Sequence, residues 1–338
     1  MVLYLRKLRR VFYIFQLISL AIVILLITTY VKTNQCILSP PDPVLILSSP
    51  LEASSNTTSD DHLWIWCQDL QFHFDAEKHI PSSPTFRSPS IINQRTHRLP
   101  YRYSNWKSSS FLARRFTPCE HYIAMSLLMF IDRICREHGL TFAIADGTLL
   151  GSWRHHDIIP WDDDVDIMMP IEEQLSFLHV LEQYKDTVVQ YHLVEYPRNN
   201  TPYAKVFFQY KPFAIQDIWS FPFIDIFFYL TNKTHLWYAN DPGVNMRIEH
   251  VFPLIMRPLG SLWLPAPHKP QFIFDFDVLT QCNSHWYDHR KEKGQSYVKR
   301  NCSDLTDVYP FVQYDERNNP IEILVINGTV IHTIIYSS

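Results

Sequence analysis

Hydrophobic positions along residues 118–184 repeat with two different periods. In the segment 118–138, apolar side chains recur every three or four residues and Gly139 follows them, which predicts an amphipathic helix that ends at this glycine. The apolar run 140–145 predicts a short strand, and the pattern of residues 171–184 predicts a second helix. These elements enclose a segment in which polar motifs are dense.

The patterns that follow are typical of strands. Residues 187–196, 203–210 and 221–230 predict three strands. Residues 322–335 predict a hairpin, because an Asn-Gly dipeptide between two alternating apolar runs suits a type I′ turn. Helices followed by several strands, without a regular βαβ repeat, predict a mixed α/β or α+β fold with a central mixed sheet flanked by helices.

The N-terminal region predicts a membrane anchor. Residues 11–31 carry no charged side chain, and about 20 apolar residues suffice to cross a bilayer. Four basic residues precede this run and only Lys32 follows it closely, so the positive-inside rule leaves the N-terminus in the cytosol. We therefore expect a cytosolic tail (1–10), a type II transmembrane anchor, a Pro- and Ser-rich lumenal stem (32–110) and a catalytic domain (111–338). A cleaved signal peptide is the alternative, although such peptides have a shorter apolar run.

Composition excludes one class of partner and favours a lumenal location. The chain has 30 Lys and Arg against 34 Asp and Glu, so no basic excess indicates nucleic-acid binding. Acceptor sequons for N-glycosylation, typical of secreted proteins, occur at Asn56, Asn199, Asn232, Asn301 and Asn327. Cys282 and Cys302 can form a local disulfide bridge, whereas Cys135 lies on the apolar stripe of the first helix and is expected to be a buried thiol.

The segment IPWDDDVDI (159–167) carries four carboxylates in five positions. If residues 164–169 form a strand, Asp164 and Asp166 point to one face, about 7 Å apart, and can jointly hold a divalent cation. Carboxylate oxygens favour Mg²⁺ or Mn²⁺, and Mg²⁺ commonly completes its shell with substrate phosphates. The cluster therefore predicts a metal and phosphate site, with a solvated acidic loop as the alternative.

The residues just upstream support a phosphate site. Gly147 and Gly151 lie in a turn that opens a helix, where backbone N–H groups can bind an anion. Arg154 follows, and a guanidinium group can grip phosphate through two hydrogen bonds. Lys205, within a predicted strand, can either meet a phosphate or extend along the surface as an ordinary lysine.

Asp225 lies alone within the apolar strand predicted at 221–230. A buried, unpaired carboxylate is costly. We therefore expect it to be a metal ligand or a base in phosphoryl transfer, or else to be paired with an arginine.

The segment ADGTLLGSWRHHDIIPWDDDVDI (145–167) resembles the signature of the LicD family, which includes bacterial phosphocholine transferases, fukutin and fukutin-related protein. Looser similarity extends over roughly residues 120–270. The resemblance implies a nucleotidyltransferase-like domain that transfers a phosphorylated alcohol, of the ribitol phosphate or phosphocholine type, from a CDP-linked donor to a glycan hydroxyl in the Golgi or endoplasmic reticulum. The residues to which it assigns roles are the metal pair Asp164 and Asp166, the third carboxylate Asp225, and the phosphate turn Gly147, Thr148, Gly151, Arg154 and His155.

These observations predict a metal-dependent phosphotransferase whose partners are a CDP-activated alcohol, a glycan or glycoprotein acceptor and, through residues 11–31, a membrane; a homo-oligomer is left open. A GT-A glycosyltransferase also uses a DxD pair, but the turn that precedes the acidic residues here suits the nucleotidyltransferase fold better. A non-catalytic glycan-binding protein is the other alternative, against which the intact carboxylates speak. Trp286, His289 and Arg290 either line a substrate pocket or have a structural role.

Overall fold

A computed structural model of the chain divides it into two compact units, 1–53 and 54–338, each considered by itself. The described residues all lie in the second unit, and they are 91–92, 107–184, 189–196, 199–208, 214–215, 218–243, 245–315 and 321–336. The predicted cytosolic tail, membrane anchor and most of the stem lie outside these ranges. Within these ranges, no helix is long and apolar enough to cross a membrane.

The helices follow the predicted periods closely. Thr117 and Glu120 cap the first long helix reciprocally: Thr117 N donates to Glu120 Oε2 at 2.8 Å, and Glu120 N donates to Thr117 Oγ1 at 3.3 Å. Gly139 ends it in the left-handed conformation, with φ 67°. The second predicted helix begins as a 3-10 turn. The helical elements of the described ranges are α3 (Pro118–His138), α4 (Asp146–His155), η2 (Ile171–Glu173), α5 (Gln174–Glu182), α6 (Ile248–Val251), η4 (Pro270–Phe272), α7 (Phe276–Thr280) and η5 (Cys302–Leu305).

The predicted strands are also present. The first half of the described strands comprises β1 (Ile91–Ile92), β2 (Ala143–Ile144), β3 (Asp166–Pro170), β4 (Val189–Tyr196), β5 (Asn199–Phe208), β6 (Ala214–Ile215), β7 (Trp219–Ser220), β8 (Phe223–Thr231), β9 (His235–Tyr238) and β10 (Asn245–Arg247). The second half comprises β11 (Leu254–Leu259), β12 (Leu262–Ala266), β13 (Gln281–Asn283), β14 (Tyr287–Asp288), β15 (Lys293–Gly294), β16 (Lys299–Asn301), β17 (Phe311–Asp315), β18 (Ile321–Ile326) and β19 (Thr329–Ile335). Asn327 and Gly328 join β18 to β19 with φ 45° and 72°, as a type I′ turn requires.

One strand prediction is wrong in a way that matters for the acidic cluster. β3 begins at Asp166, so Asp164 lies in the loop before it. The two side chains are therefore not alternate residues of one strand. Any common site for Asp164 and Asp166 depends on the path of the loop, not on the pleat of β3.

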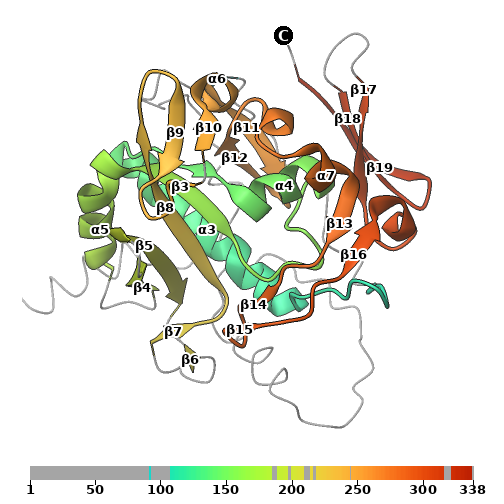
Figure 1. Cartoon of the computed structure of the whole chain (residues 1–338), viewed down its shortest axis with the longest axis horizontal. Coiled ribbons are helices and arrows are strands. Elements are labelled where there is room, and N and C mark those ends of the chain that lie inside the picture. Colours follow the sequence, from blue (N-terminus) through green and yellow to red (C-terminus); the bar gives the residue numbers. More distant parts are fainter. Residues whose placement is uncertain are drawn as a thin grey trace, which may run out of the picture. The chain divides into compact units, whose positions relative to one another are not determined.

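The central sheet of the described residues is mixed, as predicted. Its seven strands follow the order β10-β9-β8-β3-β2, with β5 paired to β8 and β4 paired to β5. β3 and β8 are parallel, whereas β2 and β5 pair antiparallel with β3 and β8 respectively. β5 occupies the first part of one edge of β8 and β9 the last part. Few helices accompany this curled sheet: α3 lies along β8 and β5, and α5 contacts β4 (Figure 1).

The hydrophobic core lies where α3 packs against the sheet. Leu127, Leu128 and Ile131 of α3 are fully buried and belong to the same cluster as Ile224 and Ile226 of β8. Burying each such side chain contributes roughly 1.5–3 kcal/mol. Cys135, on the same stripe, is a buried free thiol, which confirms the prediction. The apolar period of residues 118–138 therefore orients α3 on the sheet.

The C-terminal segment forms a second set of strands beside α4. β17, β18 and β19 make an antiparallel sheet, and α4 contacts β17 as well as β3 and β11 (Figure 1). A disulfide between Cys282 and Cys302 joins β13 to the start of η5, which confirms the predicted bridge. α4 is thus held by the central sheet on one side and by C-terminal elements on the other.

Candidate functional site

The predicted turn and helix are present at the N-terminus of α4. Asp146 adopts a left-handed backbone, with φ 41°, and the Tyr238 hydroxyl donates to its Oδ2 at 2.9 Å. The Thr148 hydroxyl oxygen accepts from the backbone N–H of Asp166 at 2.7 Å. Thr148 therefore fixes the start of β3 against the first turn of α4. This is its observed contact, and a contact with phosphate stays a prediction.

Three ionisable residues form a row across neighbouring strands. Asp166 on β3 is in register with Asp225 on β8, and Asp225 is in register with Lys205 on β5. Residues paired in this way point to the same face of a sheet. Lys205 Nζ lies 2.9 Å and 3.1 Å from the two carboxylate oxygens of Asp225, and both side chains are buried. Asp225 thus has a basic partner, a lysine instead of the arginine considered above, and Lys205 is not a surface lysine.

The ring of Phe223 covers Lys205 on β5. The Nζ atom lies 3.5 Å from the centroid of that ring, a cation–π contact that offsets some of the cost of burying the ammonium group. The ring centroids of Tyr203 and Trp219 also lie 5.5 Å and 5.4 Å from Nζ. Lys205 is therefore stabilised by Asp225 and by aromatic rings before any phosphate is present.

Gly147 lets two carboxylates approach the first turn of α4. A Cβ atom at this position would lie 2.8 Å from Asp162 Oδ2 and 3.7 Å from Asp166 Oδ2. Asp162 and Asp166 therefore face the same small space beside the backbone of the helix start. Asp162 also shares a hydrogen bond with Asp164. The loop thus brings Asp164 toward the cluster, although not in the way a strand would.

His289 holds the same loop from the C-terminal segment. Its Nδ1 lies 2.9 Å from Asp163 Oδ1, its backbone N–H donates to Asp163 Oδ2 at 3.2 Å, and its Nε2 lies 3.2 Å from Asp164 Oδ2. Burial alone would lower the pKa of His289, but Asp164 and Asp163 outweigh this and raise it to about 9. The imidazole is therefore cationic at neutral pH, and Asp163 is fixed by it, which leaves Asp163 poorly placed as a base.

Burial, followed by repulsion between neighbouring carboxylates, raises the pKa of most carboxyl groups in the cluster. Burial and the neighbouring carboxylates Asp164 and Asp146 raise the pKa of Asp166 well above its usual value. Burial and Asp164 do the same to Asp162, and burial raises the pKa of Asp146 to about 6 against the hydrogen bond from Tyr238. Asp164 differs: burial would raise its pKa, but His289 and Asp162 lower it. Ionising all of these carboxyl groups together is therefore costly unless a further cation neutralises them.

The chemistry of these side chains fits a hard divalent cation. Five carboxyl groups gather around the helix start, with Asp225 joining Asp146, Asp162, Asp164 and Asp166. Those of Asp166 and Asp225 are buried and the other three are partly exposed, and oxygen ligands of this kind suit Mg²⁺ or Mn²⁺. As the side chains are placed, however, no group of three or more His, Cys, Asp or Glu among the described residues has the arrangement needed to hold an ion. The predicted ligand set Asp164, Asp166 and Asp225 stays a prediction, and Asp225 would have to share its oxygens with Lys205.

Two of the predicted phosphate-binding side chains point elsewhere. Arg154 donates through Nη2 to the carbonyl oxygens of Val278 and Gln281, and His155 Nδ1 lies 2.6 Å from the carbonyl oxygen of Pro310. Both are buried at the end of α4, about 12 Å along the helix axis from its start. The prediction that they contact phosphate is corrected, because they attach α4 to the C-terminal segment.

Gly151 also serves packing. A Cβ atom there would lie 2.5 Å from the carbonyl oxygen of Asp157, so the glycine lets the chain after α4 fold back onto the helix. Trp153 stacks on Tyr314, with centroids 4.0 Å apart, and Trp161 is buried.

Three members of the cluster, Asp146, Asp162 and His289, are not among the ligands that the sequence predicts. Asp162 belongs to the quoted acidic run and Asp146 opens the turn motif, so their motifs were visible although their roles were not. His289 lies 126 residues after Asp163, and no spacing rule connects the two. Its contact with the acidic loop emerges only from the fold.

Comparison with known proteins agrees with this site. Residues 139–269 match the family model described as LicD/FKTN/FKRP, nucleotidyltransferase domain. The chain is 28% identical to the lipopolysaccharide cholinephosphotransferase LicD of Haemophilus influenzae over 82 residues, which are 21% of this chain and 31% of that protein. It is 23% identical to an uncharacterized protein of Rickettsia typhi over 173 residues, half of each chain. An uncharacterized protein of Rickettsia prowazekii is 39% identical over 59 residues, 18% of this chain and 22% of that protein.

The chain thus spans about a third of the Haemophilus protein and half of the Rickettsia typhi protein. Asp146, Asp162, Asp164, Asp166 and Asp225 all lie inside the segment that matches the family model. The resemblance noted in the sequence is confirmed for residues 139–269, which match the LicD-family nucleotidyltransferase domain.

Proposed function

We propose that this protein is a metal-dependent transferase that moves a phosphorylated alcohol from a CDP-linked donor to a glycan hydroxyl. The observation that carries the proposal is the gathering of five buried or partly buried carboxyl groups around the start of α4, inside the segment that matches the LicD-family domain. The Haemophilus relative is a cholinephosphotransferase, which supports the same reaction class. The sequons and the charge pattern around residues 11–31 support a Golgi or endoplasmic reticulum membrane protein with a lumenal domain.

In the proposed site, three carboxylates bind the metal and backbone N–H groups bind the phosphate. Asp162, Asp164 and Asp166 would hold a Mg²⁺ or Mn²⁺ ion, which would neutralise the donor diphosphate and the charge of the departing CMP. The backbone N–H groups of Gly147 and Thr148 belong to the first turn of α4, where the helix supplies no acceptor, and they can donate to phosphate oxygens. Positioning and electrostatics supply most of the rate acceleration in such transfers.

Asp225 is the proposed base. Burial raises its pKa, against the effect of Lys205, which brings the carboxylate closer to the acidity that proton transfer near neutral pH requires. The acceptor hydroxyl would give its proton to Asp225 while its oxygen forms a bond to the phosphorus that carries the alcohol. The bond from that phosphorus to the CMP oxygen breaks, and CMP leaves.

A donor screen tests the proposal directly. The full-length chain would be incubated with Mg²⁺ or Mn²⁺ and with CDP-ribitol, CDP-choline, CDP-glycerol and common sugar nucleotides, in the presence of a mixed glycan acceptor. We expect CMP to accumulate with one of the CDP-alcohols and a phosphodiester to form in the product. Release of a nucleoside diphosphate from a sugar nucleotide, without a phosphodiester, would instead identify a glycosyltransferase.

His289 is expected to be a positioning residue in this reaction. His289→Ala removes the two ring contacts to Asp163 and Asp164 and keeps only the backbone N–H bond to Asp163. Losing a group that orients a ligand typically costs 10- to 100-fold in metal affinity or activity. We expect the concentration of Mn²⁺ that gives half-maximal activity to rise by about tenfold or more. The metal-free melting temperature, read in parallel, separates this effect from unfolding.

A histidine on the surface of α5 supplies the control. His179→Ala removes an exposed imidazole and is expected to change neither quantity. A metal dependence in His289→Ala that matches that of His179→Ala would show that the His289 contacts are structural only.

A further inference from the structure

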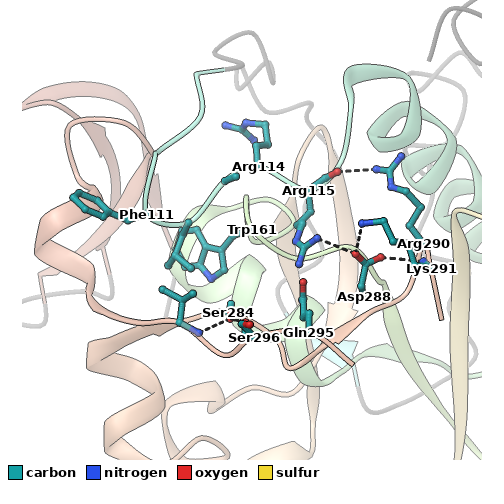
Figure 2. Close-up of a pocket in the computed structure, with 13 residues that line it drawn as sticks. Phe111, Arg114, Arg115, Trp161, Ser284, Asp288, Arg290, Lys291, Gln295 and Ser296 are labelled. Atoms are coloured by element: carbon teal, nitrogen blue, oxygen red, sulfur yellow. Dashed lines mark hydrogen bonds and ion pairs between the residues drawn. The ribbon is translucent and has the colours of Figure 1, made fainter. Parts of the chain in front are cut away.

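A cavity of about 380 Å³ lies beside the acidic cluster. Its described lining comes from the segment before α3, from the residue before the acidic run and from the C-terminal segment around β14 and β15, and it consists of Phe111, Leu112, Ala113, Arg114, Arg115, Trp161, Ser284, Asp288, Arg290, Lys291, Gln295, Ser296 and Val298 (Figure 2). The cavity and the cluster share walls at two places. Trp161 precedes Asp162, and Asp288 precedes His289.

Asp288 and His289 form one of these shared walls, and their side chains point to opposite sides of it. The carboxylate of Asp288 is turned toward the cavity, where Arg115 and Lys291 meet it (Figure 2). The ring of His289 is turned toward Asp163 and Asp164. A molecule seated in the cavity would therefore lie next to the loop that shapes the acidic cluster.

The cavity is basic. Four of its described lining residues are cationic, Arg114, Arg115, Arg290 and Lys291, and only Asp288 among them is acidic. Arg115 Nη1 lies 3.3 Å and Lys291 Nζ 3.0 Å from Asp288 Oδ2. Even with Glu120 paired to Arg290, the cations around the cavity outnumber the carboxylates. Arginine and lysine in this arrangement suit a phosphate or carboxylate ligand.

The rim adds groups that suit a sugar. Phe111 lines the cavity, and it is 53% exposed. An exposed aromatic ring in a cavity wall offers an apolar face against which a sugar ring can pack. Trp286 and Tyr297, 63% and 56% exposed, lie near the lining residues but are not among them. Trp286 is held near the rim because its carbonyl oxygen accepts from Gln295 N at 2.7 Å.

The cavity also offers hydroxyl and amide groups. Ser284, Gln295 and Ser296 line it, and they are the kinds of side chain that exchange hydrogen bonds with sugar hydroxyls. Gln295 Nε2 donates to the carbonyl oxygens of His285 and Tyr287, so its side chain is held in place.

We propose that this cavity binds an acidic saccharide, a sugar that carries a phosphate or a carboxylate, and that it is the acceptor subsite of the transferase. The anionic group would lie against Arg115 and Lys291, with the sugar ring against Phe111. The identification of the cavity as an acceptor subsite rests on the proposed function. The binding of an acidic saccharide does not, because binding requires no turnover.

The test is binding to the full-length protein in the presence of EDTA, which keeps phosphate from binding through a metal. Isothermal titration calorimetry would compare glucose 6-phosphate, glucuronate and glucose. We expect at least one of the two anionic sugars to bind about tenfold or more tightly than glucose, since a charge-assisted hydrogen bond is worth about one factor of ten. The preferred anionic sugar identifies the anionic group.

Lys291 provides the variants, because its side chain is 56% exposed and its replacement leaves the core intact. Lys291→Ala is expected to weaken binding of the preferred anionic sugar about tenfold and Lys291→Arg to restore most of it. Lys299→Ala, an exposed lysine on β16 that does not line the cavity, is expected to leave binding unchanged. Equal binding of glucose, or equal effects of Lys291→Ala and Lys299→Ala, would overturn the proposal.

Two further outcomes separate this proposal from the function above. If CDP displaces the anionic sugar, the cavity holds the donor and the acceptor assignment is wrong. If the sugar binds but no CDP-alcohol releases CMP, the transferase proposal fails and the saccharide site stands. CMP release without any sugar binding would remove the saccharide site alone.

Discussion

Asp166→Asn is expected to lower kcat for CMP release by about a hundredfold or more. Asp166 faces the space beside Gly147 together with Asp162, and it lies in register with the proposed base Asp225. Asparagine keeps the shape of the side chain but removes a charged oxygen ligand, and losing one preorganised electrostatic contact to a transition state commonly costs 10²–10³ in rate. The rate would be measured with the CDP-alcohol that the donor screen identifies.

Asp166→Asn is also expected to change the stability of the metal-free protein in a predictable direction. Burial and Asp164 raise the pKa of Asp166 well above its usual value, so the ionised carboxylate destabilises the metal-free fold above the pKa of the unfolded chain. Removing this carboxylate should make the metal-free protein at least as stable at pH 7, and the advantage should vanish as the pH falls below about 4. Urea unfolding with EDTA at several pH values measures the stability at pH 7 and its change with pH.

Asp307→Asn is the matched control for activity, because Asp307 is exposed on the C-terminal segment and the change of side chain is the same. Its kcat should equal that of the wild type. A fully folded Asp166→Asn protein with near-normal turnover would remove Asp166 from the site and, with it, the proposed centre.

Local patterns of the sequence predict local structure well in this chain. The apolar period of residues 118–138, the glycine stop at Gly139 and the Asn-Gly turn each produce the expected element, because each depends on neighbours in the sequence. The start of the acidic site is predictable for the same reason. Its turn, its helix and its carboxylates lie within about twenty residues, and the family signature covers all of them.

Local sequence patterns do not predict the contacts between segments that are distant in the chain. Lys205 reaches Asp225 because β5 and β8 pair in one register, which neither strand reveals alone. Arg154 and His155 look like phosphate ligands beside the motif, yet their hydrogen bonds go to the carbonyl oxygens of Val278, Gln281 and Pro310. These partners lie 124, 127 and 155 residues later in the chain, and no local pattern places them at the end of α4.

The same C-terminal sheet attaches to α4 through a fully buried ionic network. Arg257 on β11 donates to both carboxylate oxygens of Glu322 on β18, at 2.8 Å and 3.1 Å. His156, directly after α4, lies 2.7 Å from Glu322 Oε2, and the Tyr336 hydroxyl donates to the same oxygen at 3.1 Å. The network thus links α4, β11 and β18, and it holds the end of the helix whose start forms the acidic site.

Arg257→Met is expected to destabilise the protein by about 3–5 kcal/mol, because it leaves the Glu322 carboxylate buried without its cation. Replacing both partners, in Arg257→Met with Glu322→Leu, should recover part of this loss, since a buried apolar pair carries no uncompensated charge. Arg247→Met is the control: Arg247 pairs with Glu249 at 2.7 Å, but both side chains are more than half exposed, and such pairs contribute about 0–1 kcal/mol. Urea unfolding measures all three.

Lowering the pH should reduce the difference in free energy of unfolding between the wild type and Arg257→Met. Burial alone would raise the pKa of Glu322, but Arg257 and His156 lower it from 4.5 to about 2. The stabilisation that Arg257 gives this carboxylate is therefore complete above pH 4.5 and is lost as the pH falls toward 2. A deficit for Arg257→Met that is small at pH 7, or that grows between pH 4.5 and 2, would show that the network does not carry the attachment of the C-terminal sheet to α4.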